Sequence, residues 1–451
     1  MKKRLFLTSL VVLLLFTATT VTAQNFSMDL DIGVDYNMLD GADVVGVSIN
    51  PDIAVGNFGF GMSAIIRYSV TESRIISEDW IPDFTGDTNI WEKTQTAAAL
   101  YIPLFRYVRY GYKGDPLYAK IGDLDNVTIG TGIFVDAYSN TELQPDLRIA
   151  GLEVDVDGEL IGFPYIGFES FTNDLANFDI IGGRAYIRPL AFVEFPLLHN
   201  LQFGGSMIVD RDPDIHAELG DFTATPDMVQ MYGADVMMPI LNMGLLSLTA
   251  YGDYAFQQIP DQEMSSAIRA GAKGKILGFV TYGADITMPQ TDAVGYIPSY
   301  FNEDYDLDRS VSYESEGITS GNTYLNANAG FELLNEMLVF NLNILGELES
   351  SGSALSITDP EMKASFSLGQ GVIPFGYFDL AYEKRNLNGD SLDLFFDGVL
   401  NPTIDSTIAV NATVVYNMIE LQIGGSFDFD DTGEMTPNIT IGGDLQLPWF
   451  N

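Results

Sequence analysis

The chain has 451 residues, no cysteine, and a formal net charge of −41 from 62 acidic and 21 basic residues. This charge excludes an electrostatic nucleic-acid binder, because phosphate contacts require clustered Lys and Arg. Hydrophobic residues make up 47% of the chain, too many for an acidic disordered protein, so acidic and apolar residues must be segregated by face.

Residues 1–23 predict a cleaved secretory signal: a basic start, a short apolar core and small residues before the expected cut after Ala23. Residues 24–451 are then expected to form one domain outside the cytoplasm. After the signal, no apolar run approaches the roughly 20 residues of a membrane helix. The absence of cysteine excludes a disulfide framework.

The first segment after the signal, residues 27–37 (SMDLDIGVDYN), alternates apolar and polar residues with a period of two. Only a β-strand sends alternate side chains to opposite faces, so this segment is predicted to be a strand with one apolar and one hydrated face. A length of about ten residues suits a tilted strand that crosses a bilayer.

The same alternation recurs to the end of the chain, over residues 152–157, 246–254, 325–333, 340–349, 408–416, 421–430 and 438–447. Short connections hold Asn or Gly, whereas long acidic and aromatic connections span about 71–95, 210–226, 290–320 and 386–402. Tight turns at one end and long loops at the other are typical of an up-and-down antiparallel sheet. Closure into a barrel would remove both edges of so large a sheet and satisfy every backbone hydrogen-bonding group.

This pattern resembles that of the outer-membrane β-barrels of Gram-negative (diderm) bacteria, the porin-like class. The resemblance covers essentially the whole chain after the signal, but it depends on alternation and not on a sharp motif. It implies an all-β transmembrane barrel of about 16–20 strands, with short periplasmic turns and long acidic outer loops. It also implies outer-membrane lipids and the barrel assembly machinery as partners, although the chain departs from the usual aromatic last residue, because Phe450 is penultimate and Pro448 interrupts the segment. Residues 118–140, with Gly122, Gly130 and Gly132, look like a signature of uncharacterised envelope barrels.

Polar residues on the expected inner faces are the candidate lumen residues. They are Asp29, Asp31, Asp35, Arg184, Arg188, Asp253, Glu347 and Asp444. Arg184, Tyr186 and Arg188 share one strand face and are interpreted either as a basic ladder at a constriction or as neutralising partners of inward carboxylates. Arg106 and Arg109 have opposite parity, so a regular strand would not turn both of them inward.

Two acidic loops raise the question of a metal. Asp210, Asp212 and Asp214 precede Ile215, where an EF-hand requires Gly, and residues 302–308 form a second acidic cluster. Both are expected to be solvated loops, with weak surface Ca²⁺ binding as the alternative. No cofactor is expected. No nucleophile, base or phosphate-binding pattern accompanies His199 or His216, so an enzyme is not expected.

The sequence therefore predicts a porin-like passive channel in the cell outer membrane for small polar or cationic solutes. The alternative is a non-conducting surface barrel that acts as an adhesin or structural envelope protein. A secreted soluble β protein is the third possibility. The oligomeric state, the solute and an open or plugged lumen are not predicted.

Overall fold

A computed structural model describes most of the chain after residue 25. The described residues are 26–39, 42–71, 73–76, 104–141, 149–213, 228–259, 263–290, 321–334, 337–351, 354–373, 376–384, 406–416, 419–429 and 435–445, with isolated positions between 82 and 101. The predicted signal and the C-terminal aromatic residues lie outside them. No helix in this part of the chain has the length and apolarity needed to cross a membrane.

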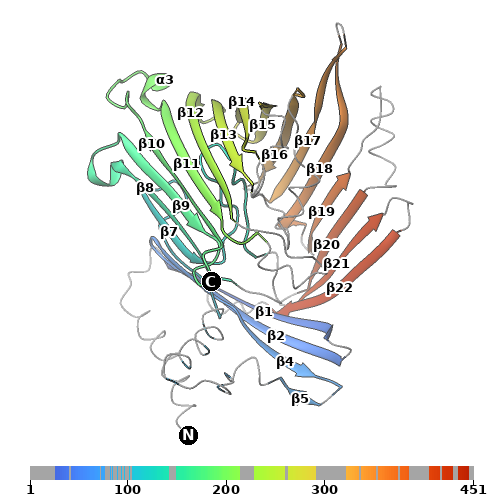
Figure 1. The fold of residues 1–451 in the computed structure, drawn as a ribbon. Helices are drawn as coiled ribbons and strands as arrows, with labels where there is room; N and C mark the ends of the chain where they lie inside the picture. The colour runs from blue at the N-terminus through green and yellow to red at the C-terminus, as the bar shows by residue number, and fades with distance from the viewer. Residues whose placement is uncertain are drawn as a thin grey trace.

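The fold is almost entirely antiparallel β-structure (Figure 1). In chain order the strands are β1 (Phe26–Leu39), β2 (Ala42–Val55), β3 (Phe58–Met62), β4 (Ala64–Ser69), β5 (Arg74–Ile75), β6 (Phe105–Tyr110), β7 (Leu117–Gly122), β8 (Gly151–Asp157), β9 (Ile166–Thr172), β10 (Ile180–Ile187), β11 (Gln202–Asp210), β12 (Val229–Met243), β13 (Leu246–Gln258), β14 (Ser265–Ile276), β15 (Val280–Pro289), β16 (Tyr324–Leu333), β17 (Leu338–Ser351), β18 (Ala354–Ile373), β19 (Gly376–Lys384), β20 (Ser406–Tyr416), β21 (Ile419–Phe429) and β22 (Met435–Leu445). Two short helices, η4 (Gly158–Ile161) and α3 (Pro196–His199), lie in turns.

The strand pairings close into a ring. Each strand from β6 to β22 pairs with the next, β3 links β2 to β6, and β22 returns to β1 through Gly33 opposite Asp444. In Figure 1 the last, red strands meet the first, blue ones. Of the 22 strands in the described ranges, β4 continues the course of β3 along β2, and β5 pairs there only with β4, which leaves 20 in the ring. The prediction of an antiparallel sheet of about 16–20 long strands is confirmed.

The connections alternate between two ends of the ring. At one end the links are short, as between β12 and β13 or between β14 and β15. The other end carries the long connections, such as the one from Pro289 to Tyr324, although the β1–β2 and β17–β18 links at this end are also short. The acidic loops predicted at 290–320 and 386–402 lie outside the described residues.

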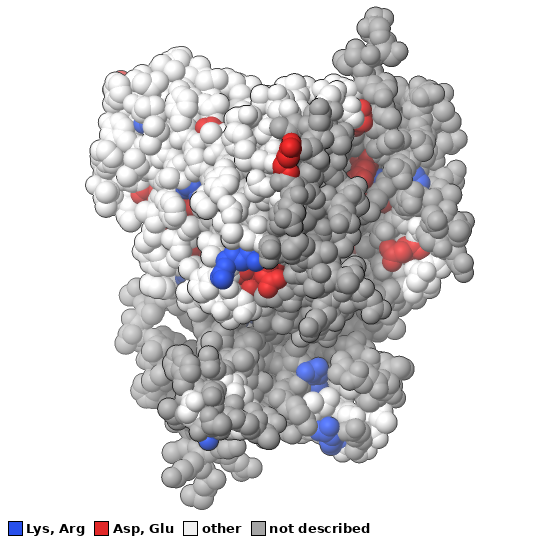
Figure 2. Space-filling model, in the orientation of Figure 1, with Lys and Arg blue, Asp and Glu red and all other residues white. Residues whose placement is uncertain are grey.

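The two faces of the sheet differ in chemistry. Large apolar side chains are exposed on the outer face of successive strands: Val108, Ile121, Phe168, Ile181, Phe203, Met207, Val236, Tyr254, Ile268, Ile286 and Met288. Polar side chains are buried on the inner face: Glu153, Arg184, Asp235, Asp253, Arg269, Asp285 and Thr287. The described surface in Figure 2 accordingly shows few charged side chains. Alternation along each strand thus places apolar residues outside and charged residues inside, as the sequence predicted.

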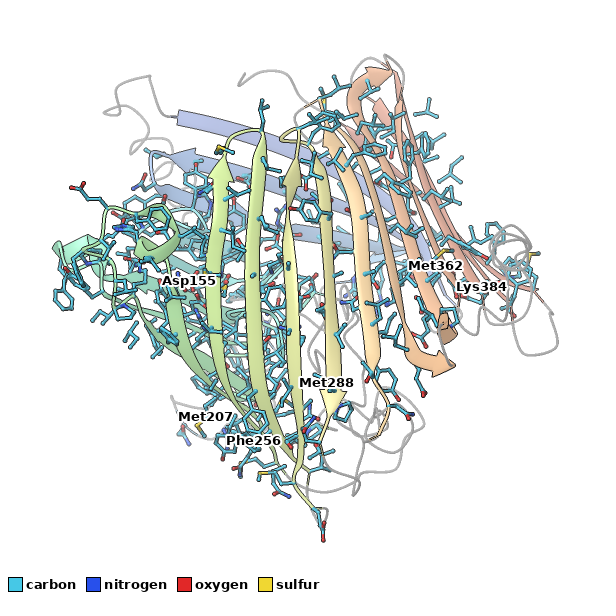
Figure 3. All side chains as sticks on the ribbon, turned by 90° about the horizontal axis from the view of Figure 1, so that it is seen from above. Asp155, Met207, Phe256, Met288, Met362 and Lys384 are labelled. Atoms are coloured by element: carbon cyan, nitrogen blue, oxygen red, sulfur yellow. The ribbon has the colours of Figure 1, made fainter. Side chains whose placement is uncertain are left out.

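Part of the interior is filled by the chain between β7 and β8. Residues 123–140 of this connection, here called the inward segment, bring seven buried apolar side chains into the barrel: Leu124, Val127, Ile129, Ile133, Phe134, Val135 and Tyr138. They pack against wall residues of β9 to β14, including Phe171, Ile208 and Met231. Seen from above, side chains fill much of the space between the green strands and the blue strands behind them (Figure 3). The barrel interior is therefore partly an apolar core and not wholly a hydrated lumen.

Candidate functional site: the charged barrel interior

The inward segment is a small hairpin held by its own backbone. Val127 and Tyr138 exchange two N–H to C=O hydrogen bonds of 2.9 Å, and the Ile129 N–H donates to the Val135 carbonyl at 3.1 Å. At its base, the Asn140 side chain accepts from the Leu124 N–H at 2.7 Å and donates to the Asn173 carbonyl at 2.8 Å. The last contact ties the segment to the β9–β10 turn. The segment is therefore an ordered element of the interior.

Glycines with positive φ allow the segment to enter the barrel. Gly122 (φ +116°) and Gly130 (φ +61°) adopt left-handed conformations that side chains rarely tolerate. A Cβ on Gly122 would lie 2.2 Å from the Arg106 carbonyl oxygen, and one on Gly130 would lie 2.6 Å from the Arg184 Cδ. The glycine series noticed in the sequence thus marks the point where the chain turns inward and the point where it touches the wall.

The first of two buried charge clusters, the Arg184 cluster, lies where β9, β10 and β12 meet the segment. The fully buried Arg184 guanidinium donates to both Asp235 carboxylate oxygens, at 2.7 and 2.8 Å, and to Glu169 at 3.1 Å. Glu169 in turn accepts the backbone N–H of Gly130 at 2.8 Å. This bidentate pair is strong and directional, and through Glu169 it holds the tip of the inward segment.

The second, the Thr131 cluster, joins the segment to β13 and β14. The Arg269 guanidinium donates to Asp253 at 2.9 Å and to the Thr131 hydroxyl oxygen and carbonyl at 2.9 and 3.2 Å. The Thr131 hydroxyl itself donates to Asp253. The Asp253 and Arg269 side chains are 1% and 8% exposed, so this ion pair is shielded from water. Thr131 of the segment supplies hydrogen-bonding partners to both members of the pair.

Farther round the wall, the inner face carries the Asp285 carboxylate among uncharged polar side chains. Tyr251 donates to Asp285 at 3.1 Å, Asn326 donates to Asp285 at 3.4 Å, and Asn343 donates to Asn326 at 2.9 Å. This chain of hydrogen bonds crosses β13, β15, β16 and β17. Rows of Asn and Asp are typical of the hydrated face of a large barrel.

The predicted lumen residues are distributed over several strands. Arg184 and Asp253 belong to the two clusters, and Arg188 pairs with Asp157 beside the β8–β9 turn. Glu347 lies opposite Tyr324 on the face that carries Asn343. Asp29, Asp31 and Asp35 lie on β1 opposite Asp52, Asn50 and Gly46, and Asp444 lies opposite Gly33 and Glu420, but the side chains of all four lie outside the described residues. That these eight residues line the lumen stays a prediction.

Arg184 in β10 and Arg188 just after it do not form an open ladder. Arg184 is bound by Asp235 and Glu169, and Arg188 by Asp157 and Glu159. This arrangement corresponds to the alternative in which these arginines neutralise inward carboxylates. On a regular strand Arg106 and Arg109 would face opposite sides, but β6 is not regular, because it bulges at Arg106. Tyr107 pairs with Gly61 and Phe105 with Met62, which leaves Arg106 as the extra residue. Both arginines line one pocket.

Among the described residues, no group of three or more acidic or histidine side chains could hold a metal ion. His199 ends α3, and its Nδ1 lies 3.2 Å from the Val193 carbonyl oxygen. Asp214, His216 and residues 302–308 lie outside the described residues. Weak Ca²⁺ binding there stays a prediction.

Sequence reasoning missed the inward segment and the partners of its ion pairs. Asp235 and Arg269 fall in strands outside the alternating segments named in the sequence, and Thr131 lies 122 residues from Asp253. The one available signal was the glycine series of residues 122–132 between two alternating strands. Alternation assigns a residue to a face, but it carries no information about which distant chain covers that face.

Comparisons with known proteins gave no family-model match and no match among curated proteins. Solved structures that match include OprD from Pseudomonas aeruginosa (TM-score 0.36, 12% identity, 94% of each chain covered) and a BenF-like porin from Pseudomonas fluorescens Pf-5 (0.35, 9% identity, 94% of this chain and 98% of that one). CdiB from Acinetobacter baumannii gives a TM-score of 0.28 at 9% identity, and the match covers 93% of this chain and 60% of that one. These likenesses are too distant to support an inference about this chain.

Proposed function

We propose that this protein is an outer-membrane β-barrel that acts as a passive, porin-like channel for small polar or cationic solutes, and not as an enzyme. The observation that supports this proposal best is the division of faces on a ring of paired strands, with large apolar side chains exposed outside and ionised side chains inside. A soluble protein rarely exposes so large an apolar surface. In a bilayer, the same surface faces the hydrocarbon.

The chemistry of the inner face supports the proposal that polar solutes pass through the barrel. The polar face of β13 to β17 offers hydrogen-bonding groups, while the inward segment occupies the side next to β9–β14. Solutes then pass between the segment and the opposite wall, so the segment sets the width of the channel. Because the carboxylates of the Arg184 and Thr131 clusters are paired with arginines, the net charge of −41 acts mainly as a long-range attraction for cations.

The proposal includes export, assembly and cell location. Residues 1–23 direct secretion, residues 24–451 form one barrel domain, and the barrel assembly machinery inserts it into the outer membrane. The predicted signal supports the first step. No cofactor is required for passive diffusion.

The test is reconstitution of the full mature chain into planar bilayers, with a KCl gradient to measure the reversal potential. We expect stepwise conductance increases and a modest cation preference. An anion preference would contradict cation selectivity, and the absence of conductance from correctly folded protein would contradict the channel itself. Folding is checked in parallel by the shift in electrophoretic mobility on heating.

The alternative is a non-conducting surface barrel that acts as an adhesin or structural protein. The apolar core around the inward segment favours it, because seven apolar side chains reduce the open cross-section. Surface labelling of intact cells, combined with zero conductance, would support this alternative. Release of the chain into the aqueous phase of a detergent extraction would contradict both functions.

A further inference from the structure

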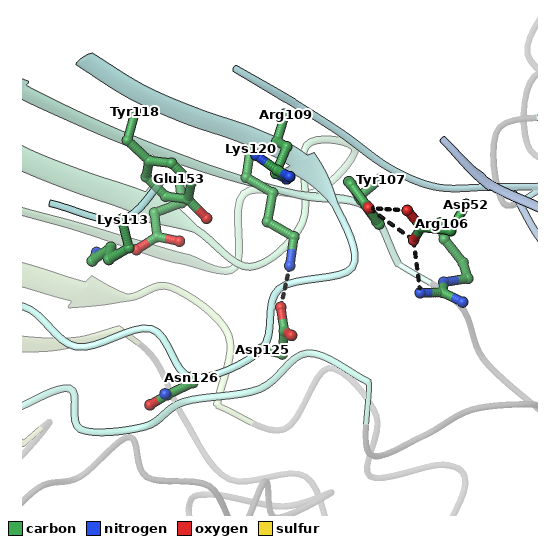
Figure 4. Close-up of a pocket in the computed structure, with 10 residues that line it drawn as sticks. All are labelled: Asp52, Arg106, Tyr107, Arg109, Lys113, Tyr118, Lys120, Asp125, Asn126 and Glu153. Atoms are coloured by element: carbon green, nitrogen blue, oxygen red, sulfur yellow. Dashed lines mark hydrogen bonds and ion pairs between the residues drawn. The ribbon is translucent and has the colours of Figure 1, made fainter. Parts of the chain in front are cut away.

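A pocket of about 450 Å³ lies between the inner faces of β6, β7 and β8 and the start of the inward segment (Figure 4). This volume is within the range of small-molecule sites. Its lining includes four of the chain's 21 basic residues: Arg106, Arg109, Lys113 and Lys120. Four cationic side chains around one pocket are unexpected in a protein with a net charge of −41, and they indicate that the pocket binds an anionic group.

Part of the pocket is internally neutralised. Lys113 pairs with Glu153 and, at 2.9 Å, with Asp155, and its Nζ lies 5.7 Å from the Tyr118 ring centre. Burial lowers the pKa of Lys113, but the two carboxylates outweigh it and the pKa is raised. Lys113 is therefore a cation whose charge two carboxylates already balance.

The other part holds two cations directly opposite each other. Arg109 of β6 is the register partner of Lys120 of β7. Like charges at opposed positions of neighbouring strands are destabilising. Lys120 is offset by Asp125. Among the described residues, no carboxylate pairs with Arg109, whose guanidinium lies 4.0 Å from the Tyr112 ring centre and donates to the Gly111 carbonyl at 2.9 Å.

Arg106 adds a third cation to this side, through the bulge in β6. Its Nη2 lies 3.7 Å from Asp52, too far for a hydrogen bond, and its side chain is 37% exposed. Asp52 is already bound by the Tyr107 hydroxyl, which lies 2.8 Å from both carboxylate oxygens. The Arg106 guanidinium thus has donors free for another partner. In Figure 4, Arg109 and Lys120 lie together at the centre, and Arg106 lies beside Tyr107 and Asp52.

We propose that this pocket is a binding site for the oxyanion group, a carboxylate or a phosphate, of a small solute held between Arg106, Arg109 and Lys120. An oxyanion removes the repulsion between Arg109 and Lys120 and accepts charge-assisted hydrogen bonds from both. The site rests on the proposed channel, because the solute reaches it through the lumen. It adds an anion-binding site to a pore whose overall charge favours cations.

Without a solute, the Asp125 carboxylate occupies the position beside Lys120 that the oxyanion of the solute would take. Its carboxylate is 74% exposed, whereas Lys120, with which it pairs, is 12% exposed. Because the Asp125 carboxylate is largely in water, breaking its pair with Lys120 costs less than breaking a pair in which both groups are buried. A solute oxyanion therefore displaces Asp125 from Lys120. The start of the inward segment then loses its ion pair with β7.

The test is calorimetric titration of the full mature chain in detergent, at low ionic strength, with succinate, inorganic phosphate and uncharged glycerol. We expect at least one anion to bind and glycerol not to bind. Tight binding of succinate alone identifies a carboxylate site, and of phosphate alone a phosphate site. Absence of binding by both anions up to 10 mM (about the weak limit of a useful site) would overturn the proposal.

Single substitutions distinguish the loss of a cation in the pocket from a change in the shape of the pocket. Arg109→Gln and Lys120→Gln should each weaken binding about tenfold to a hundredfold, the usual loss for one charge-assisted hydrogen bond. Gly59→Ala keeps every charge, but its Cβ would lie 2.6 Å from the Arg109 Nε, so it should displace Arg109 and weaken binding too. Asp125→Asn should tighten binding, and unchanged or weaker binding would contradict the competition.

Lys275→Gln is the matched control, because Lys275 pairs with Glu332 elsewhere on the inner face. It should bind the anion as the unmodified chain does. A loss equal to that of Arg109→Gln would mean that general interior charge, and not the pocket, attracts the anion. Conductance is measured on the same samples, so a chain that conducts without binding overturns only the site, and one that binds without conducting overturns only the channel.

Discussion

Thr131 offers the sharpest test of how the inward segment is attached to the wall. Its hydroxyl lies between Arg269, which donates to it at 2.9 Å, and Asp253, which accepts from it. Thr131→Val keeps the side-chain shape and removes only this hydroxyl. The residue is 5% exposed, so water does not readily replace the lost partner.

The expected magnitude follows from these contacts. A hydrogen bond to a charged group contributes about 1.5–3 kcal/mol. Thr131→Val removes two such bonds, one from Arg269 and one to Asp253. Arg269 keeps its bonds to Asp253 and to the Thr131 carbonyl, which offset part of this loss, so the net loss is taken as that of about one such bond. At 1.4 kcal/mol per factor of ten, the undocked population of the segment should rise about 10-fold to 150-fold.

Hydrogen exchange measures this population directly, because local opening exposes the amides of the segment. The amides to follow are those of Val127, Ile129 and Tyr138, which are bonded inside the segment, and Gly130, which is bonded to Glu169. Peptides covering residues 124–140 should exchange faster in Thr131→Val by the same factor, while β13 and β14 keep their protection.

The control is Thr407→Val, which removes a hydroxyl that donates to Asp428 at 2.9 Å on β20 and β21, away from the segment. It should leave exchange in residues 124–140 unchanged. Unchanged protection in Thr131→Val would refute the reasoning. Equal acceleration across β13 and β14 would show that the hydroxyl supports the wall and not the docking.

Three further outcomes are expected. Replacing residues 124–139 with a short Gly-Ser linker should increase single-channel conductance in planar bilayers, because the segment fills part of the interior; an unchanged conductance would place the solute path elsewhere. Gly130→Ala should lower the free energy of unfolding in urea more than Gly162→Ala does: both glycines have positive φ, but only the Gly130 Cβ would meet Arg184, and equal losses would contradict that contact. Val236→Lys, on the outer face at the middle of the 15-residue β12, should cost about 2–4 kcal/mol of stability in lipid vesicles, against about 0–1 kcal/mol for Met243→Lys at the end of β12; equal costs would argue against a bilayer around this face.

The sequence predicted the elements of this fold well, because strand alternation is a local property. Leu152, Glu153 and Val154 show the principle: the carboxylate is 3% exposed inside the barrel, and its apolar neighbours lie on the opposite face. The ring itself followed from the number of strands and the cost of free edges. Both conclusions require only residue type and spacing.

The interior could be predicted only in part. The bulge at Arg106 depends on how β6 pairs with β3, which spacing along β6 alone does not reveal. The bond from Thr131 to Asp253 joins residues 122 positions apart, and no periodicity encodes such a contact. The candidate residues Asp253 and Arg184 were found because they lie on inner strand faces, whereas their partners Arg269 and Asp235 required the three-dimensional arrangement.

The measurement that tests the central claim most directly is spin-label accessibility on β11 in lipid vesicles. Because the chain has no cysteine, single variants can be labelled without background. Labels at Phe203→Cys and Met207→Cys, on the outer face, should collide with oxygen dissolved in the bilayer, and labels at Gln202→Cys and Ser206→Cys should not. Oxygen accessibility at positions 202 and 206 in place of 203 and 207, or exposure of all four labels to a water-soluble nickel reagent, would contradict a barrel with apolar residues toward lipid and charges within.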